Sequence, residues 1–482
     1  MTTIAYAGLI AFLGIAWYLS FYIDGYHLLA PTSLGTLAIL VGGIFAFVGV
    51  STWNTSELGF KTVSIVIVGT SSYVAGGYFA RKLMAAHKKR QLVKRDNRFD
   101  APDRSNAGWL ASGMCHTAGY SFHVATWKLV AFTLVILAAA IIRIHETVKL
   151  GVSSGIHFSS YMELAQWVRW TYSPIFSEGN VQFGVGYSVV ARQMLKILFV
   201  GGYVSSFYLG YNLGNKGLKK EIVFFTVCFM LCCSCTFLEG ERATIFGYFV
   251  AVLASSFIRD VRYGQNPLRI SIKYCKVITV ALVVAFAVFY ALGKLIGRVG
   301  SSGPIEYITF YFGCGIPSMQ EALNTGLNLS TSPGSQTFAG LYDLLYKFHL
   351  MELPAGGSNL FVTLGGKASN IYTQYYGYYC DFGFAGVAVF PMLSSVILSL
   401  IYRVSTTAHA PWCTLLYPAI CGYIVDQVRG AFVFSVLFSL SWIVSYILLS
   451  ITVCLLFYQK TATSRCFHQM RDESGKSDIV SD

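Results

Sequence analysis

Three stretches of one polar segment decide how the chain folds: YFGCGIPSMQEALN (311–324), GSQTFAGLYDLLYKF (334–348) and SNIYTQYYGYYCDFGFAG (369–386). The segment, 297–379, lies between two apolar runs. A connection of about 80 residues is far longer than connections in compact proteins usually are, and such long loops are commonly functional. We therefore expect it to form a structured cap that lies on, or dips into, one face of the molecule.

The middle stretch predicts a helix within this cap. Apolar side chains recur at helical spacing from Leu341 to Phe348. Asp343 precedes Lys347 by four residues, a spacing at which opposite charges pair along a helix. The cap is therefore expected to contain at least one amphipathic helix.

The composition is that of a membrane protein, with 55% hydrophobic and only 12% charged residues. Apolar runs of about 20 residues, the length a helix needs to cross the hydrocarbon core, recur along the chain. We predict an all-α polytopic membrane protein with about 11 transmembrane helices, between 10 and 12. The predicted spans are 3–23, 32–50, 61–80, 123–142, 187–209, 221–238, 243–258, 274–296, 380–402, 412–428 and 431–457.

Basic residues set the predicted orientation. Eight lysines and arginines lie in 81–98, and such an excess marks cytoplasmic loops. Alternation from there places the basic loop 81–122 and the tail 458–482 in the cytoplasm, and 143–186 and 297–379 outside. The net charge of +13 follows this pattern, so we expect the lipid bilayer as the partner of the basic residues, and no nucleic acid.

The outer segment 143–186 predicts a helix lying in the membrane interface. Apolar side chains share one helical face, with two tryptophans on its flank. The face consists of Phe158, Tyr161, Leu164, Ala165 and Val168, and the tryptophans are Trp167 and Trp170. The helix is expected to be either an anchor or a wall of a site for lipid headgroups or sugars.

Charged residues interrupt the apolar runs near the outer ends of spans. They are Glu239, Glu241 and Arg242 in a short turn, Arg298 after the eighth span, and Asp426 and Arg429 in the weakest span. Charges at such depth are costly and tend to be functional. Each group also has a structural interpretation, as snorkelling turn residues, an interfacial flank and a self-neutralising pair.

Four blocks of the polar segment, in this order and in one loop, resemble the signature region of the bacterial oligosaccharide repeat-unit polymerases, the O-antigen polymerase family. The blocks are Gly315-Ile316-Pro317, Gly334-Ser335-Gln336-Thr337-Phe338, Asn370-Ile371-Tyr372-Thr373 and Tyr378-Tyr379-Cys380-Asp381-Phe382-Gly383. Cys380 is particular to this chain. The resemblance covers roughly 300–390, and the remainder fits in hydropathy and topology alone.

The resemblance implies a membrane-embedded glycosyltransferase of the bacterial plasma (inner) membrane, with an architecture like the C-type enzymes and an active site facing the periplasm or exterior. It would polymerise undecaprenyl-pyrophosphate-linked oligosaccharide repeat units into O-antigen, the polymer of lipopolysaccharide, or a similar surface polysaccharide. No metal or nucleotide cofactor is implied. A chain-length regulator and a flippase of the same polysaccharide biosynthesis pathway are implied as partners.

The chemistry needs cations for the pyrophosphate, a carboxylate for the acceptor hydroxyl, and side chains that hold sugars. The candidate pyrophosphate-binding residues are Arg242, Arg298 and Arg429. The candidate catalytic carboxylates are Glu239, Glu241, Asp381 and Asp426. The candidate sugar-binding residues are Asn370, Tyr372, Tyr376 and Tyr379, although about half of the tyrosines in this loop are expected to stabilise the fold instead.

Two other functions stay open. An O-antigen ligase-like transferase would use the same donor but attach the chain to a lipid A core, and the block at 369–386 favours the polymerase. A lipid-linked oligosaccharide flippase should show two related halves and short loops, whereas this chain has no internal repeat and one dominant loop. The sequence also lacks an Asp-x-Asp pair and a GxxxxGK[ST] motif, so the activated lipid is the expected energy source.

Overall fold

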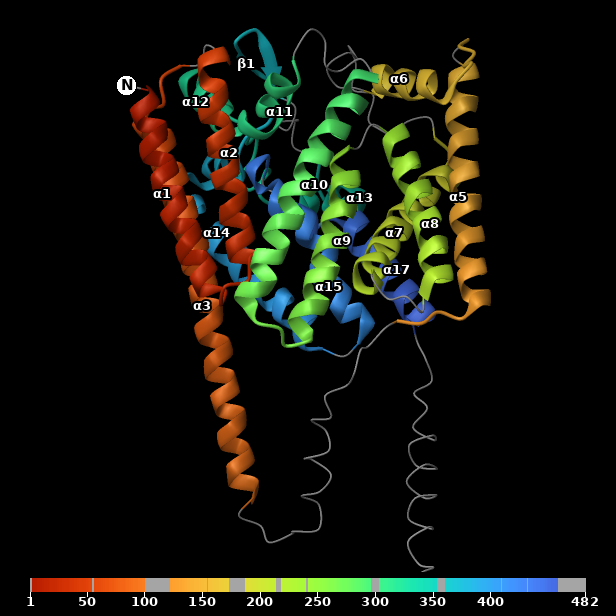
Figure 1. Ribbon diagram of the computed structural model, residues 1–482. Helices are drawn as coiled ribbons and strands as arrows, with labels where there is room; N and C mark the ends of the chain where they lie inside the picture. Colours follow the sequence, from red (N-terminus) through yellow and green to blue (C-terminus); the bar gives the residue numbers. More distant parts are fainter. Residues whose placement is uncertain are drawn as a thin grey trace, which may run out of the picture.

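The computed structural model describes residues 2–53, 56–99, 122–153, 155–172, 187–213, 218–239, 242–295, 303–352, 360–408, 410–430 and 432–457. Most of the long helices stand side by side in one bundle (Figure 1). The helices are α1 (Thr2–Ile23), α2 (Pro31–Trp53), α3 (Phe60–Phe99), α5 (Thr126–Ser153), α6 (Tyr161–Tyr172), α7 (Val189–Asn212), α8 (Lys219–Leu238), α9 (Arg242–Arg262), α10 (Pro267–Leu295), α11 (Pro304–Gly313), α12 (Gly315–Asn324), α13 (Ala339–Lys347), α14 (Gln374–Thr407), α15 (Pro411–Val425), the 3-10 helix η4 (Asp426–Val428), α16 (Phe432–Leu437) and α17 (Leu440–Phe457). Strands β1 (Val362–Leu364) and β2 (Lys367–Ser369) form an antiparallel hairpin.

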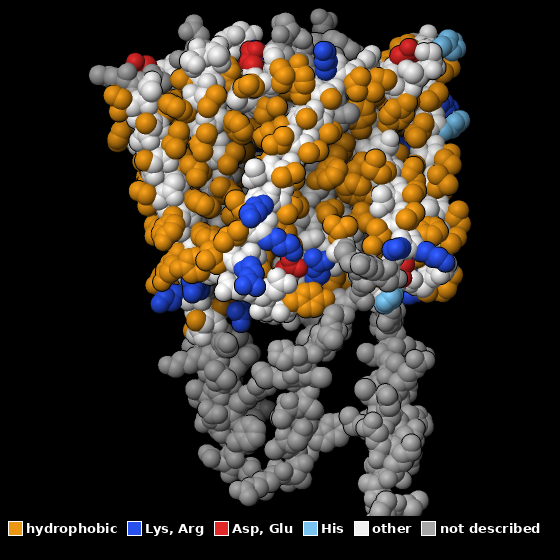
Figure 2. Space-filling model, viewed as in Figure 1, with side chains coloured by type: hydrophobic (Ala, Val, Ile, Leu, Met, Phe, Trp, Pro, Cys, Tyr) orange, Lys and Arg blue, Asp and Glu red, His pale blue; other side chains and the backbone are white. Residues whose placement is uncertain are grey.

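The prediction of an all-α polytopic membrane protein is confirmed. Within the described residues, nine helices are long and apolar enough to cross a membrane: α1, α2, α3, α5, α8, α9, α10, α14 and α17. Apolar side chains cover most of the side of the bundle seen in Figure 2. The predicted spans 187–209 and 412–428 fold as α7 and α15, which are not among the nine. With 15 residues, α15 is shorter than the roughly 20 that a span needs.

The two ends of the bundle differ in charge and structure. The short elements α6, α11, α12 and β1 lie at one end, and α3 extends beyond the bundle at the other (Figure 1). Lysine and arginine side chains gather at the end from which α3 extends (Figure 2). Helix α3 continues to Phe99, so the run 81–98, expected to be a loop, is helical. The separation of a basic end from a loop-bearing end matches the charge pattern of the sequence.

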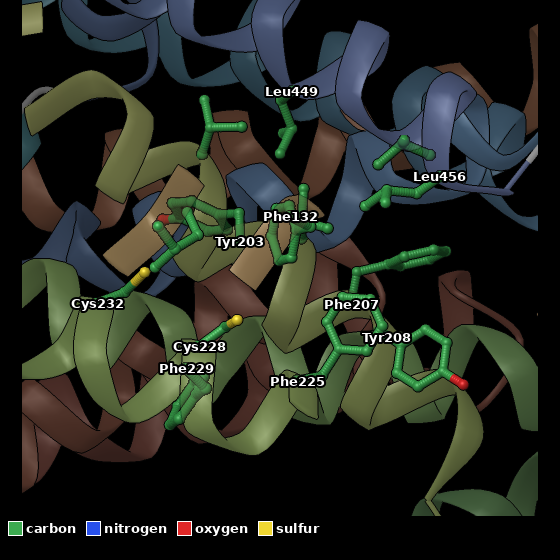
Figure 3. Close-up of a cluster of buried hydrophobic side chains, with 14 of the residues drawn as sticks. Phe132, Tyr203, Phe207, Tyr208, Phe225, Cys228, Phe229, Cys232, Leu449 and Leu456 are labelled. Atoms are coloured by element: carbon green, nitrogen blue, oxygen red, sulfur yellow. The ribbon is translucent and has the colours of Figure 1, made fainter. Parts of the chain in front are cut away.

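One half of the core is built around α7, which is buried along most of its length. Rings from α7 pack on those of α8, with Tyr208 and Phe225 stacked at a centroid distance of 4.0 Å. In Figure 3 Cys228 lies between Phe225 and Cys232, and the two thiols are buried in the same apolar cluster as the rings. The thiols of α8 therefore pack as small apolar groups, as their type usually does.

Helix α11 runs inward along α2. The Phe310 ring meets the ring of Trp53, the last residue of α2, edge-on at a centroid distance of 5.5 Å. Gly313 then touches the α2 backbone, because a Cβ on it would lie 2.6 Å from Ala46 N. Trp53 and Ala46 are seven residues apart, about 10 Å along a helix. The last residue of α11 therefore lies about 10 Å deeper in the bundle than the last residue of α2.

Helix α12 runs outward again. Gln320 Oε1 accepts hydrogen bonds from Gly59 N (2.7 Å) and Thr62 Oγ1 (2.6 Å), at the beginning of α3. The next residue, Glu321, accepts a hydrogen bond of 2.7 Å from Ser56 Oγ in the α2–α3 connection. Helices α11 and α12 therefore form a re-entrant turn, with Cys314 between them at its deepest part.

Helix α14 contains a reversal of the chain, which its contacts along α3 reveal. The Lys61 ammonium lies 4.9 Å from the centroid of the Tyr379 ring, and the hydroxyls of Thr70 and Tyr375 are 3.2 Å apart. Further along α3, Gly76 lies so close to the carbonyl oxygen of residue 392 that a Cβ would collide with it. Tyr379 thus lies nearer the beginning of α3 than Tyr375 does. Residue 392 lies beside a later part of α3 than either tyrosine. The chain runs outward from Gln374 to Tyr379 and then turns inward.

Gly383 makes this reversal possible. Its φ of 61° and ψ of −151° fall in a region that only glycine enters readily. Beyond it the two segments lie against each other, with the Tyr378 and Phe390 rings stacked at 5.4 Å. The structure therefore starts α14 at Gln374, deep in the bundle, where the sequence predicted a span starting at 380 and a loop up to 379.

We expect Gly383→Ala to lower the stability of the folded protein by about 1–3 kcal/mol, because a methyl group is strained at this φ and ψ. Thermal unfolding of the detergent-solubilised protein measures this change. The matched control is Gly14→Ala in α1, where a Cβ meets nothing within 4 Å. Equal melting temperatures for wild type and Gly383→Ala would contradict the reversal.

Candidate functional site

Three breaks in helical structure meet inside the bundle, and we call this place the central junction. It consists of Cys314–Gly315 at the re-entrant turn, Thr373–Gln374 at the beginning of α14, and 426–429 after α15. A Cβ on Gly315 would lie 2.5 Å from Val428 O and 3.6 Å from Thr373 N, so only glycine lets the three segments approach this closely. Irregular backbone at membrane depth is tolerated where protein or a water-filled cavity covers it.

A chain of hydrogen bonds ties α14 to η4 and α3. Gln374 Nε2 donates to Gln427 Oε1 (2.7 Å), and Gln427 Nε2 donates to the Tyr73 hydroxyl (3.4 Å). The Tyr73 hydroxyl donates in turn to Pro31 O (3.1 Å). Gln374 is fully buried, and Tyr73 and Gln427 are each 1% exposed. The sequence analysis missed these glutamines, although two amides beside apolar runs are an unusual feature in a membrane protein.

Asp426 and Arg429 form the ion pair of the central junction. Arg429 Nε donates to Asp426 Oδ1 at 3.0 Å, and an Arg429 terminal nitrogen donates to the same oxygen. The exposed fractions of their side chains are 17% for Arg429 and 13% for Asp426. The pair is thus the part of the central junction that reaches the surface.

The sequence blocks of the polar segment meet one another. Asp381 accepts hydrogen bonds from Thr337 N (2.6 Å), Thr337 Oγ1 (2.7 Å) and Gln336 N (3.2 Å). Ser318 Oγ donates to Ser369 Oγ at 2.9 Å, beside the re-entrant turn. Asp381 is therefore placed as a tie between two blocks, and its carboxylate is already engaged within the protein.

The candidate sugar-binding residues divide into two kinds. Tyr372 and Tyr376 are buried, and their hydroxyls donate to the carbonyls of Leu360 and Leu327. Tyr379 and Asn370 are half-buried. The first two therefore stabilise the fold, and only the second two have surface to offer a ligand.

A buried ion pair that the sequence analysis missed links α5 to the end of α8. Arg143 Nε donates to Glu239 Oε1, and the exposed fraction of each side chain is 1%. The Arg143 guanidinium carbon lies 3.5 Å from the centroid of the Tyr187 ring. An arginine after the apolar run of α5 could have been recognised as a buried charge, because such charges are rare and usually paired. A carboxylate held by a permanent cation is poorly placed to act as a base.

Helix α6 packs over this end of α8 and confirms the predicted helix. Leu164, Ala165 and Val168 are buried against Phe237 and Leu238. These three residues of the predicted apolar face therefore cover protein and hold in place the residues next to Glu239, whereas Tyr161 of the same face is exposed.

The other candidates are only partly described. Glu241 and Arg298 lie outside the described residues, and Arg242 begins α9 without a described side chain. Cys314 and Cys380, at the two ends of the polar segment, are both free thiols.

The hairpin β1–β2 closes over α11 at the loop-bearing end. Lys367 pairs with Glu306, and this hydrogen bond lowers the pKa of the Glu306 carboxyl.

Comparison of the chain with family models, with curated proteins and with solved structures gives no match.

We expect Glu239→Leu alone to lower the stability by about 3–5 kcal/mol, because it leaves Arg143 buried without its carboxylate. The double variant Arg143→Met/Glu239→Leu should recover most of that loss, since an apolar pair replaces an ion pair at little cost. Thermal unfolding of the two variants measures the difference. A double variant no more stable than Glu239→Leu would contradict the structural role of this pair.

Proposed function

We propose that the chain is an integral membrane glycosyltransferase that polymerises undecaprenyl-pyrophosphate-linked oligosaccharide repeat units at the outer face of the bacterial plasma membrane. The observation that carries this proposal is the convergence of the sequence blocks. The blocks that resemble the polymerase family are spread from 315 to 383, yet they meet in pairs. Gly315 packs against Thr373 and Val428 at the central junction, and Thr337 bonds to Asp381 further out along α14. A loop serving only as a tether would need no such contacts.

The loop-bearing end would face outward and the basic end the cytoplasm. The excess of lysine and arginine at one end of the bundle supports this orientation (Figure 2). The polypeptide enters the central junction from the loop-bearing end along α11 and returns to that end along α12. The chemistry would therefore occur on the outer side. An activated lipid then supplies the energy.

Arg429 is the candidate pyrophosphate ligand with a described side chain. Its guanidinium fork matches two phosphate oxygens, and the charge stabilises the pyrophosphate as it leaves the sugar. Arg242 and Arg298 are also proposed as pyrophosphate ligands, from the sequence alone.

Among the three candidate carboxylates that the structure describes, Glu239, Asp381 and Asp426, the last is the best placed. Glu239 is held by Arg143, and Asp381 is held by the Thr337 backbone and hydroxyl. When a phosphate draws Arg429 away, the Asp426 carboxylate becomes free to accept the proton of the acceptor hydroxyl. The hydroxyl oxygen then bonds to the anomeric carbon as the bond to the lipid pyrophosphate breaks.

The proposal is tested with purified protein in vesicles that contain lipid-linked repeat units. Polymerisation gives a ladder of product sizes. Transfer of a chain to a lipid A core without a ladder would favour the ligase, and translocation alone would favour the flippase. Either result would overturn the proposed function.

We expect Arg429→Ala to reduce polymerisation roughly 30- to 1000-fold, the equivalent of about 2–4 kcal/mol of transition-state stabilisation. Arg429→Lys should rescue poorly, because an ammonium lacks the two-pronged geometry. Lys347→Ala is the control, since Lys347 pairs with Asp343 at an exposed helix surface. The measurement is the distribution of product sizes, normalised to the amount of folded enzyme in the membrane. An unchanged distribution of product sizes in Arg429→Ala would show that Arg429 is not a pyrophosphate ligand.

A further inference from the structure

Helix α13 has little protein packed against it. Of its nine residues, all of which the structure describes, Gly340 alone is buried. Leu341 and Tyr346 are exposed, and the Phe348 side chain just after the helix is 63% exposed. The apolar face that the sequence predicted for this helix is therefore not covered by the described part of the protein, and water would be an unfavourable cover for it.

The position of α13 along the bundle follows from its one close contact. A Cβ on Gly340 would lie 2.7 Å from Ser439 N, at the connection between α16 and α17. Seven residues later, about 10 Å along a helix, the Tyr446 hydroxyl donates to Trp412 O at 3.4 Å. Trp412 is at the beginning of α15, which lies at the basic end, where Arg262 donates to the last carbonyls of α14.

These contacts place the beginning of α13 inside the region that hydrocarbon surrounds, which is about 30 Å thick. In Figure 1, α13 accordingly lies about halfway along the bundle, whereas α6, α11 and β1 lie at the loop-bearing end. Just before α13, Thr337 is bonded to Asp381, beside the reversal of α14 at its outermost part. The chain therefore descends to α13 from the loop-bearing end.

The two faces of α13 need different surroundings at this depth. Leu341, Leu345 and Phe348 share one face, at intervals of four and three residues. Asp343 and Lys347 lie on the opposite face and form an ion pair of 2.5 Å, with 38% and 47% of their side chains exposed. Charged groups at this depth are costly in hydrocarbon and usually pair and face a water-filled cavity. The charged face therefore favours water, and the apolar face favours lipid.

The end of α13 is closed by its own backbone. Leu350 N donates to Leu345 O and His349 N donates to Tyr346 O, both at 2.9 Å. The two bonds form through His349, whose φ of 55° is the left-handed conformation of such a helix end. Carbonyls at a helix end that lies in lipid must be bonded within the protein, because no water reaches them there. Leu350 itself is 71% exposed.

The apolar face of α13 continues a surface that already faces lipid. The Phe438 ring, between α16 and α17, lies 6.0 Å from the ring of Phe338, the residue before α13. Phe438 is exposed, and so is Ile443 on α17, a helix apolar enough to cross a membrane. An exposed apolar surface thus runs from α17 onto α13, as expected for a surface that acyl chains cover.

We propose that α13 separates lipid from water within the membrane. Its apolar face, with Phe348 and Leu350, contacts the acyl chains of the bilayer lipids. The face with Asp343 and Lys347 lines a water-filled cavity, the vestibule, which opens at the loop-bearing end. The two charges satisfy each other and need only water around them. This arrangement is independent of the proposed reaction, and it gives the headgroup of a lipid substrate a hydrated way into the bundle while its hydrocarbon tail stays in lipid.

Introduced cysteines in the full-length, membrane-embedded protein test both faces. The reagent is a charged, membrane-impermeant methanethiosulfonate, and the labelled peptides are identified by mass spectrometry. Asp343→Cys and Lys347→Cys should react at least about 10-fold faster than Leu341→Cys and Phe348→Cys, because hydrocarbon excludes a charged reagent. The reaction should require reagent on the loop-bearing side of the membrane.

Two further cysteines mark the sides of the membrane. Thr363→Cys in β1 and Gln265→Cys between α9 and α10 are exposed positions at the loop-bearing and basic ends. Lys347→Cys should be labelled from the same side as Thr363→Cys. The contact with lipid is tested on wild type, so that it does not depend on the folding of a variant. A diazirine dissolved in the bilayer and activated by light should modify Phe348 and Leu350.

Each contrary outcome overturns the arrangement. Fast reaction at all four positions of α13 would show that water surrounds the helix, and slow reaction at all four would exclude the vestibule. Labelling of Lys347→Cys only from the side of Gln265→Cys would place the opening at the wrong end. Absence of the diazirine from both Phe348 and Leu350 would exclude the contact with lipid. None of these results depends on whether the protein polymerises saccharides.

Discussion

The structure depends on one constraint: inside a membrane every backbone N–H and C=O group needs a partner. In the part of the chain that the structure describes, three breaks in the helices meet at the central junction, where they pack against one another and not against lipid. The re-entrant turn packs on η4 through Gly315, and the segment before α14 is held by Ser369 and Gln374. The polar segment enters the bundle at Cys314 and at Gln374, where other parts of the protein surround the irregular backbone.

This arrangement concentrates polarity where the chemistry is proposed. Two ion pairs illustrate the difference between support and function. Arg143 and Glu239 are both closed off from solvent, so they fix the end of α8 beneath α6. Asp426 and Arg429 are partly exposed and lie where helices α12 and α14 begin. A charge that retains some surface can exchange its partner for a ligand, whereas a fully buried one cannot do so without a large cost.

Local patterns predicted much of the fold, and long-range contacts account for what they missed. Periodicity was sufficient for the helix from Ala339 to Lys347 and for α6, since each depends on neighbours three and four residues away. It could not reveal the reversal at Gly383, because the run beyond it is apolar enough to resemble a simple span. The same limit applied to the site. Arg429 and Asp426 were found from sequence, but the partnership of Gln374 with Gln427 joins residues more than fifty positions apart.

The central claim is that the segment leading into α14 is inserted beside the re-entrant turn. Ser369 Oγ lies 3.5 Å from the thiol of Cys314, so Ser369→Cys offers the most direct test. Under mild oxidation of the membrane-embedded protein, the introduced thiol should join Cys314 in a disulfide, identified by mass spectrometry of the linked peptides and absent in Ser369→Cys/Cys314→Ala. An introduced thiol that stays unlinked and reacts readily with a membrane-impermeant reagent would show that the segment lies outside the bundle, and the account would be contradicted.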